Sequence, residues 1–276
     1  MITQHPLYLS TPLSAHALDT APPDCTRGSI VLRVATPSDL DALVNIALVA
    51  MPMDPQWDYR FPHRRSFPGD TLLFTRRRYR EFLENKSGRW SVILAELVYR
   101  RSMPRNRKSY AQSIAFAVWD VAHISPGAPV ASREAALPTC GIPSRRDASC
   151  KRLKAWKQTL STSSRDLFDK QYGLRYFQLQ ILATHPRFHR IGAGTALCRQ
   201  GIRAAEKLDM KIAVFASPMG KRLYGKLGFR KLATVKIQVE GEDESICIEA
   251  MSYEPNSWSR PLGEYPELPY LAGNYS

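Results

Sequence analysis

The stretch HPRFHRIGAGT, residues 185–195, decides how the rest of the chain is interpreted. It stands between a predicted strand at 176–184 and a predicted helix at 194–209. Gly192 and Gly194 permit a tight turn and a close approach to a ligand, because glycine has no Cβ. The N–H groups at the start of a helix carry a partial charge of about +0.5. The stretch therefore predicts a binding site for an anion such as a pyrophosphate.

The stretch does not match two well-known phosphate-binding glycine motifs. No Gly-Lys-Ser/Thr follows it, so it is not a Walker A loop. The third glycine of a dinucleotide-binding fingerprint is missing, and the next predicted strand, 211–216, does not end on an acidic residue. A Gly-x-Gly alone also occurs in ordinary tight turns. Arg187 and Arg190 beside the glycines add positive charge and favour an anion.

Hydrophobic periodicity and turn residues divide the rest of the chain into strands and helices. We expect strands at 30–34, 90–99, 112–121, 176–184, 211–216, 231–239 and 245–253. We expect helices at 37–46, 70–86, 147–172, 194–209 and 217–227, with loops at 51–69 and 122–146. This order predicts an α/β sandwich around one mixed sheet. The predicted organisation is an irregular arm at 1–29, one domain at 30–255 with an insertion at about 122–175, and a C-terminal tail at 256–276.

The composition indicates a globular protein with an anionic partner. Of the 276 residues, 44% are hydrophobic and 23% are charged, which excludes collagen, a coiled coil and full-length disorder. The net charge is +14, and the segment 60–108 holds 14 Lys and Arg residues against 4 Asp and Glu residues. Such an excess favours nucleic acid, an anionic membrane or a phosphorylated small molecule. A solvated basic face is the simplest reading, and a substrate or nucleic-acid patch is the alternative.

Several classes of protein are excluded by what the sequence lacks. No run approaches the roughly 18 apolar residues of a spanning helix, and residues 1–10 do not have the pattern of a secretory signal. The five cysteines are scattered without a Cys-x-x-Cys pair, so no metal site is predicted. We therefore expect a cytoplasmic protein without a membrane partner.

Two motifs in register resemble the GCN5-related N-acetyltransferase (GNAT) superfamily. His189-Arg190 followed by Gly192-Ala193-Gly194 is similar to the family's Gln/Arg-x-x-Gly-x-Gly/Ala loop, with His189 as a departure. Residues 217–229, SPMGKRLYGKLGF, are similar to its Leu-Tyr-x-x-Leu-Gly-Phe segment. The resemblance covers about 30–255 and is specific over 176–253.

The resemblance implies the GNAT fold, in which a mostly antiparallel twisted sheet is flanked by helices and two splayed strands form the acyl-CoA cleft. It also implies acetyl-CoA as the cofactor. The residues that would bind it are Leu182, Ala183, Thr184, His189, Arg190, Ile191, Gly192, Ala193, Gly194, Thr195, Ser217, Tyr224 and Lys226. Tyr224 matches the tyrosine that protonates the leaving thiolate, although it could simply be a packing residue of its helix. A familiar general base is missing, and Glu96 is the best carboxylate, with His123, Gln178, Gln180 or a bound water as alternatives.

The acceptor is expected to be a small-molecule amine. Trp57, Tyr59, Phe61 and Trp119 are predicted to line its pocket, which differs from a groove for a cationic peptide. The predicted function is the direct transfer of an acetyl group from acetyl-CoA to this amine, by a monomer or homodimer that has no nucleic-acid partner. The alternatives are a protein of this fold that uses another acyl-CoA or another reaction, and a basic nucleic-acid-binding or interaction protein that retains the fold.

Overall fold

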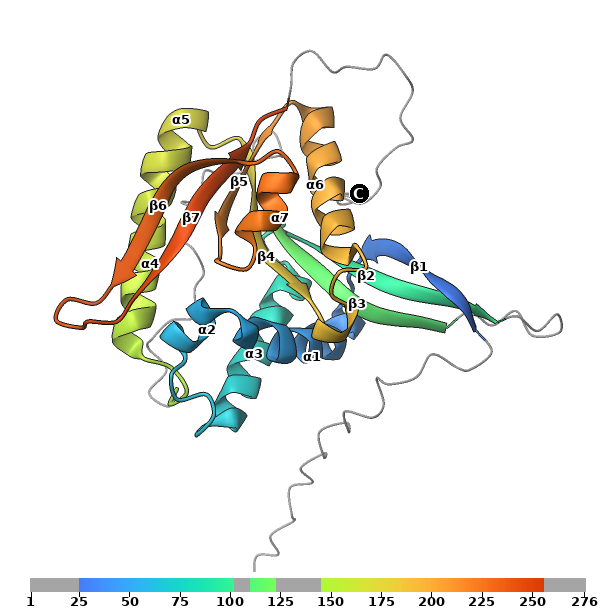
Figure 1. Cartoon of the computed structure of the whole chain (residues 1–276), viewed down its shortest axis with the longest axis horizontal. Coiled ribbons are helices and arrows are strands. Elements are labelled where there is room, and N and C mark those ends of the chain that lie inside the picture. Colours follow the sequence, from blue (N-terminus) through green and yellow to red (C-terminus); the bar gives the residue numbers. More distant parts are fainter. Residues whose placement is uncertain (1–24, 102–109, 123–144, 256–276) are drawn as a thin grey trace, which may run out of the picture.

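The computed structural model describes residues 25–101, 110–122 and 145–255, and Figure 1 shows their arrangement. Within these ranges the strands form one seven-stranded sheet in the order β1-β2-β3-β4-β5-β7-β6. The strands are β1 (Cys25–Val34), β2 (Trp90–Arg101), β3 (Tyr110–Asp120), β4 (Tyr176–Thr184), β5 (Lys211–Ala216), β6 (Arg230–Gln238) and β7 (Ser245–Tyr253). Neighbouring strands are antiparallel except for β4 and β5, which are parallel. The fold class is therefore the mixed, mostly antiparallel α/β sheet that the sequence predicts.

Helices cover both faces of the sheet (Figure 1). They are α1 (Leu40–Ala50), α2 (Pro55–Arg60), α3 (Pro68–Glu84), α4 (Cys150–Ser164), α5 (Lys170–Tyr172), α6 (Ala193–Leu208) and α7 (Lys221–Lys226), with short 3-10 or π turns at Pro37–Asp39, Met51–Met53, Arg165–Asp169 and Pro186–Phe188. Helix α6 packs on one face of β2 to β5. Helices α1 and α3 pack on the other face of β2 to β4, and α4 packs beside them over β6. No helix in the described ranges is both long and apolar enough to cross a membrane.

The structure confirms most of the predicted elements and changes three of them. Strands β4 and β5 have the predicted bounds, but β1 begins five residues before the predicted strand because it pairs with β2 as far as Arg101. The predicted loop at 51–69 contains α2, which Pro55 begins and Asp54 caps by accepting from the Gln56 N–H group at 3.3 Å. Helix α7 begins at Lys221, later than predicted, because 217–220 form a turn. Most of the predicted loop at 122–146 lies outside the described residues.

The centre of the sheet is irregular at β4. Val118 of β3 pairs with Ile181, while the next residue, Trp119, pairs with Leu179. Gln180 is therefore an extra residue on β4, which is a β-bulge and bends the strand. Pairing between β4 and β5 runs from Tyr176–Lys211 only to Leu179–Val214, although both strands continue. The two strands thus separate just past the bulge, and this opening positions the candidate site.

Candidate active site

A cavity of about 220 Å³ lies where β4 and β5 separate. Its floor is formed by 178–182 of β4 and by the end of β5, and its walls come from α2, α3 and α4. Tyr224 of α7 and Ser217 reach it from the other side of the opening. About half of the remaining lining side chains are aromatic or aliphatic, and the others are polar and include three arginines. A pocket that combines apolar walls with placed polar groups is the usual form of a small-molecule site.

The predicted glycine loop leads into the start of α6. Gly192, the N-cap residue, has a φ of 99°, and Arg190 has a φ of 68°, so the chain turns through left-handed conformations. The first intrahelical bond joins the Ala196 N–H group to the Gly192 carbonyl at 2.9 Å. No side chain among the described residues caps this helix. The N–H groups of its first turn are therefore available to an anion, and the binding of a pyrophosphate there stays a prediction.

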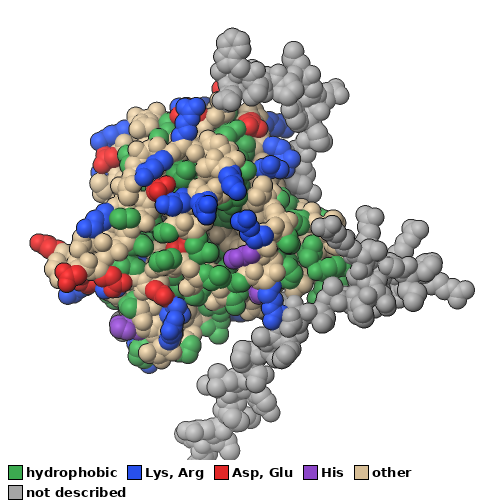
Figure 2. Space-filling model, in the orientation of Figure 1, with side chains coloured by type: hydrophobic (Ala, Val, Ile, Leu, Met, Phe, Trp, Pro, Cys, Tyr) green, Lys and Arg blue, Asp and Glu red, His purple; other side chains and the backbone are tan. Residues whose placement is uncertain are grey.

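Further contacts hold this loop against β4. The His189 Nε2–H group donates to the Thr184 carbonyl at 3.0 Å, so His189 connects the loop to the end of the strand. A Cβ placed on Gly194 would lie 3.5 Å from Leu223 and 3.8 Å from Leu182, so the first turn of α6 packs closely on α7 and β4. Figure 2 shows blue Lys and Arg side chains spread over the face that carries α6 and α7. The start of α6 thus lies on a face that carries many cationic side chains, and no described side chain caps its N–H groups.

The other residues predicted to bind the cofactor differ in exposure. Leu182 and Ser217 line the cavity, and the Ser217 hydroxyl accepts from the Gly220 N–H group at 3.2 Å. Ala183 and Ala193 are buried in the core, whereas Ile191 and Lys226 are exposed. Thr195 is half-buried in the first turn of α6. The side chains of Ala183 and Ala193 are therefore packing groups, and only their backbones remain candidates for ligand binding.

Tyr224 is the predicted catalytic residue that lines the cavity. Its side chain is 6% exposed and packs on Phe229, with ring centroids 5.6 Å apart. Its hydroxyl makes no hydrogen bond with any described residue. Burial raises the pKa of Tyr224 well above its usual value, so the phenol stays protonated at neutral pH. A protonated hydroxyl without a partner is available as a proton donor.

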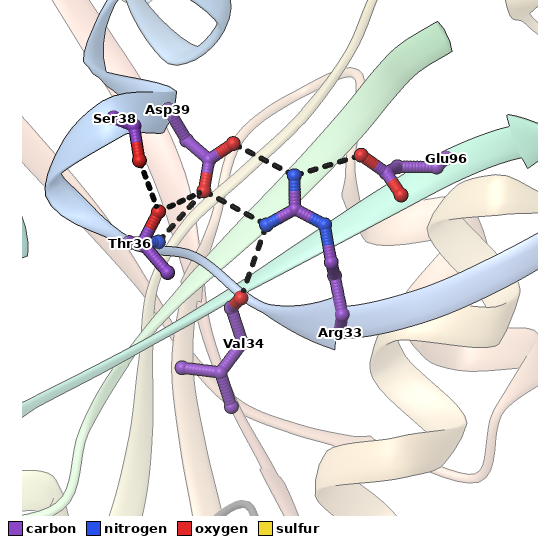
Figure 3. A network of polar contacts seen from close by, with 6 residues as sticks. All are labelled: Arg33, Val34, Thr36, Ser38, Asp39 and Glu96. Atoms are coloured by element: carbon purple, nitrogen blue, oxygen red, sulfur yellow. Dashed lines mark hydrogen bonds and ion pairs between the residues drawn. The ribbon is translucent and has the colours of Figure 1, made fainter. Parts of the chain in front are cut away.

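Glu96 has a structural partner instead of a place at the cavity. Figure 3 shows its carboxylate pointing toward Arg33, whose Nη2 lies 2.7 Å from Glu96 Oε1. The same guanidinium binds Asp39 through two contacts of 2.7 and 2.8 Å. The hydrogen bonds from Arg33 lower the pKa of the Asp39 carboxyl to about 2. This network joins β1, β2 and the turn that begins α1, and Glu96 is not among the residues that line the cavity.

Replacing Glu96 with glutamine tests this structural assignment. We expect kcat to stay within about threefold of the wild-type value, because the side chain does not reach the cavity. The free energy of unfolding should fall by about 1–2 kcal/mol, since one charged partner of Arg33 is lost. Steady-state kinetics and urea unfolding would measure the two effects. A large loss of kcat with unchanged stability would instead restore Glu96 as a candidate base.

Because α2 is a helix, the side chains predicted to bind the acceptor point in different directions. Trp57 and Phe61 lie four positions apart on one side of the helix, line the cavity and contact each other at 4.5 Å between ring centroids. Tyr59 points away into the cluster with Val235 and Ile237, where the Arg152 guanidinium lies 4.9 Å from its ring. The sequence predicts a loop here and places Tyr59 in the pocket, whereas the helix directs its side chain into the core instead.

Trp119 also lies outside the cavity. It is buried under α6 on the opposite face of the sheet, in the cluster that contains Leu197 and Ile202. A Cβ placed on Gly201 of α6 would lie 2.3 Å from the Trp119 indole, so the helix backbone packs directly on this ring. Trp119 is therefore a core residue, and its predicted contact with the acceptor is not supported.

Because Gly201 packs closely on Trp119, adding a single methyl group at this position should destabilise the fold strongly. We expect Gly201→Ala to lower the free energy of unfolding by about 1–3 kcal/mol, because the core must shift to admit the Cβ. The higher helix propensity of alanine returns up to about 1 kcal/mol of this loss. Urea unfolding would measure the difference. Equal or higher stability would show that the indole moves without cost.

Several residues of the cavity were not singled out by the sequence. The arginines Arg60, Arg78 and Arg145 line it together with Phe74, Tyr79, Phe82 and Trp156. The first two arginines belong to the basic segment 60–108, and the aromatics follow helical spacing. Neither pattern distinguishes a cavity wall from an exposed or core-facing surface. The available signal was the density of aromatic and basic residues in 57–82.

The chain was compared with protein-family models, with curated proteins and with solved structures. No protein-family model matches the sequence. An acetyltransferase of Stachybotrys chartarum is 23% identical over 231 residues, which cover 81% of this chain and 90% of that protein. A mosquito arylalkylamine N-acetyltransferase like 5b is 22% identical, with a TM-score of 0.52 over 82% of this chain and all of that chain. A structure described as histone acetyltransferase HPA2 and related acetyltransferase from Corynebacterium glutamicum is 19% identical, with a TM-score of 0.49 over 86% of this chain and all of that chain. The likeness to the mosquito N-acetyltransferase shows that the chain has the fold of the GCN5-related N-acetyltransferase superfamily, as its two motifs predict.

Proposed function

We propose that this chain is an acetyl-CoA-dependent N-acetyltransferase that transfers an acetyl group directly to an amine of a small-molecule acceptor. One observation carries the proposal. The cavity at the separation of β4 and β5 is lined by Tyr224, Leu182 and Ser217 and lies close to the start of α6, which no described side chain caps. The acetyltransferase name of the Stachybotrys chartarum relative agrees with this reaction.

The residues around the separation fit acetyl-CoA. The free N–H groups of 190–195 would hold its pyrophosphate, with Arg190 and the exposed Lys226 adding charge. Beyond Leu179, no strand among the described residues pairs with β4 on its β5 side. Backbone groups of β4 in this stretch, such as those of Leu182 and the N–H group of Thr184, would bind the amide-rich pantetheine arm, since unpaired backbone groups need hydrogen-bond partners. Acetyl-CoA would supply an acetyl group activated as a thioester.

The chain's own groups would then assist the transfer in two ways. Backbone N–H donors fixed beside the cavity would polarise the carbonyl that is attacked. Tyr224 would donate its hydroxyl proton to the departing sulfur, as its burial and protonation allow. The described lining of the cavity contains no carboxylate and no histidine. We infer that the amine enters in its neutral form or loses its proton to water.

The cavity walls support a small acceptor. Trp57, Phe61, Phe74 and Trp156 surround a volume of about 220 Å³, which suits a compact molecule with an apolar body. Two of these rings, Trp57 and Phe61, belong to the segment that the sequence predicts to bind the acceptor.

Isothermal titration calorimetry with acetyl-CoA, CoA and dephospho-CoA tests the proposal. We expect acetyl-CoA and CoA to bind with one site per chain. Release of free thiol from acetyl-CoA across a panel of primary amines would then identify turnover. The absence of binding by acetyl-CoA, with a folded protein, would refute the proposal.

A further inference from the structure

Of the three guanidinium groups in the described lining of the cavity, one has no anionic partner among the described residues. Arg145 binds Asp147 through contacts of 2.8 and 3.2 Å, and Arg78 lies 3.3 Å from Glu81. Arg60, in contrast, forms no ion pair with any described residue. Its Nε–H group donates to the Gln56 carbonyl at 3.1 Å, which leaves the two terminal nitrogens free.

Aromatic rings hold the Arg60 guanidinium in place. Its Cζ lies 4.4 Å from the ring centroid of Trp156, 5.4 Å from that of Trp57 and 5.3 Å from that of Phe61. Burial lowers the pKa of Arg60 to about 10, so the group is still charged at neutral pH. Asp54 is the carboxylate that favours this charge, but it caps α2 and makes no ion pair with Arg60. A fixed charge that has lost much of its water favours an anion that can replace the water.

The other residues of the cavity also favour a ligand that carries an anionic group. No acidic side chain lines the part of the cavity that the structure describes, whereas three arginines do. A purely cationic amine would meet uncompensated positive charge, while an amine that also carries an anionic group would neutralise it. Because only one guanidinium of the cavity is unpaired among the described residues, a singly charged anion fits better than a phosphate. The two terminal nitrogens of arginine form a planar fork that matches the two oxygens of a carboxylate.

We propose that the acceptor is an amine that carries a carboxylate and an apolar or aromatic body, and that Arg60 binds the carboxylate. This inference rests on the proposed function, because it names the acceptor class of that reaction. Arg60 on α2 and Tyr224 on α7 line the same cavity from different elements. The carboxylate would lie at Arg60, the apolar body between the aromatic walls, and the amine toward Tyr224.

Matched acid and amide pairs test this assignment. The probes are L-phenylglycine, L-phenylalanine and L-homophenylalanine, each compared with its carboxamide, which keeps the ring and the amine and removes the negative charge. Binding to the protein alone is measured by calorimetry, and turnover with acetyl-CoA is measured by thiol release. We expect the acid of at least one pair to exceed its amide about tenfold in affinity and in kcat/KM, the usual effect of a charge-assisted hydrogen bond.

Three variants assign this preference to Arg60. Arg60→Gln should bring the acid-to-amide ratio close to one, because it removes the positive charge that the carboxylate would meet. Arg60→Lys should keep part of the preference, because lysine retains the charge without the planar fork. Arg77→Gln, on the exposed side of α3, removes the same charge outside the cavity and should leave the ratio unchanged. If Arg60→Gln does not fold, as judged by circular dichroism, a lower ratio in Arg60→Lys supports the assignment and an unchanged ratio overturns it.

Two results would overturn the inference. One is the absence of acid preference in all three pairs, and the other is a preference that survives intact in Arg60→Gln. The binding measurement needs no acetyl-CoA, so it separates this inference from the proposed function. Failure to bind acetyl-CoA would refute the reaction and leave the acid preference standing. Acetylation of acids and amides at equal rates would refute only the role of Arg60.

Discussion

Replacing Tyr224 with phenylalanine is expected to lower kcat about a hundredfold, the lower range for a positioned general acid. The change removes only the hydroxyl, which has no hydrogen-bond partner among the described residues, from a side chain that lines the cavity. The ring contact with Phe229 remains, so the fold and the affinity for acetyl-CoA should be preserved. Steady-state kinetics with saturating acetyl-CoA, together with calorimetry, would separate the two quantities. Because its pKa is raised, ionisation of Tyr224 should cause no loss of activity below about pH 10 in the wild-type enzyme.

Tyr253→Phe provides a matched control for this experiment. Tyr253 also packs on Phe229, at 5.6 Å between ring centroids, but its hydroxyl binds Glu206 at 2.6 Å and does not line the cavity. We expect kcat of this variant within about twofold of wild type. If Tyr224→Phe behaves in the same way, the proton must come from another group or from water, and Tyr224 is then only a packing residue.

Replacing Gly192 with valine is expected to weaken the binding of acetyl-CoA about tenfold or more. Gly192 has a φ of 99°, which a β-branched residue adopts only with strain of about 1–3 kcal/mol. The loop would relieve this strain by changing its backbone dihedral angles. The N–H groups at the start of α6 would then no longer point toward one ligand. Calorimetry with acetyl-CoA measures the effect directly.

Gly69→Ala is the matched control for the loop. Gly69 lies in the first turn of α3, its φ is not positive, and no atom lies within 4 Å of an added Cβ. We expect unchanged affinity and equal or slightly higher thermal stability, because alanine restricts the unfolded chain more than glycine does. Equal affinity in Gly192→Val and Gly69→Ala would show that the loop does not depend on its left-handed turn.

The parts of the fold that the sequence predicts well are those in which a local pattern is sufficient. Strands β4 and β5 are short apolar runs bounded by turn residues, so their limits could be read directly. The loop before α6 needs glycine at a left-handed position, and Gly192 meets this need. Helix α2 was missed because six residues are too few for a periodic pattern. The helical turn of this segment nevertheless directs Trp57 and Phe61 into the cavity and Tyr59 into the core.

The candidate site itself depends on contacts that sequence patterns do not encode. Glu96 and Arg33 are far apart in the chain, and only the pairing of β1 with β2 brings them together. Trp119 lies on a strand that is buried on both faces, so alternation could not show which face it occupies. The role proposed for Arg60 required knowing which arginines already have carboxylate partners. These are properties of the packed structure.

The short pairing between β4 and β5 also has a consequence for motion. It joins two halves of the sheet, β1 to β4 and β5 to β6, across a seam with hydrogen bonds at one end only. Such a seam is a natural axis for hinge-like opening, in which amide protons beyond Leu179 would exchange sooner than those of the strand interiors. A ligand that contacts both halves of the sheet would then hold them together, and it would raise the melting temperature because it binds only the folded state. The seam that admits the ligand would thus become the region that the ligand stiffens most.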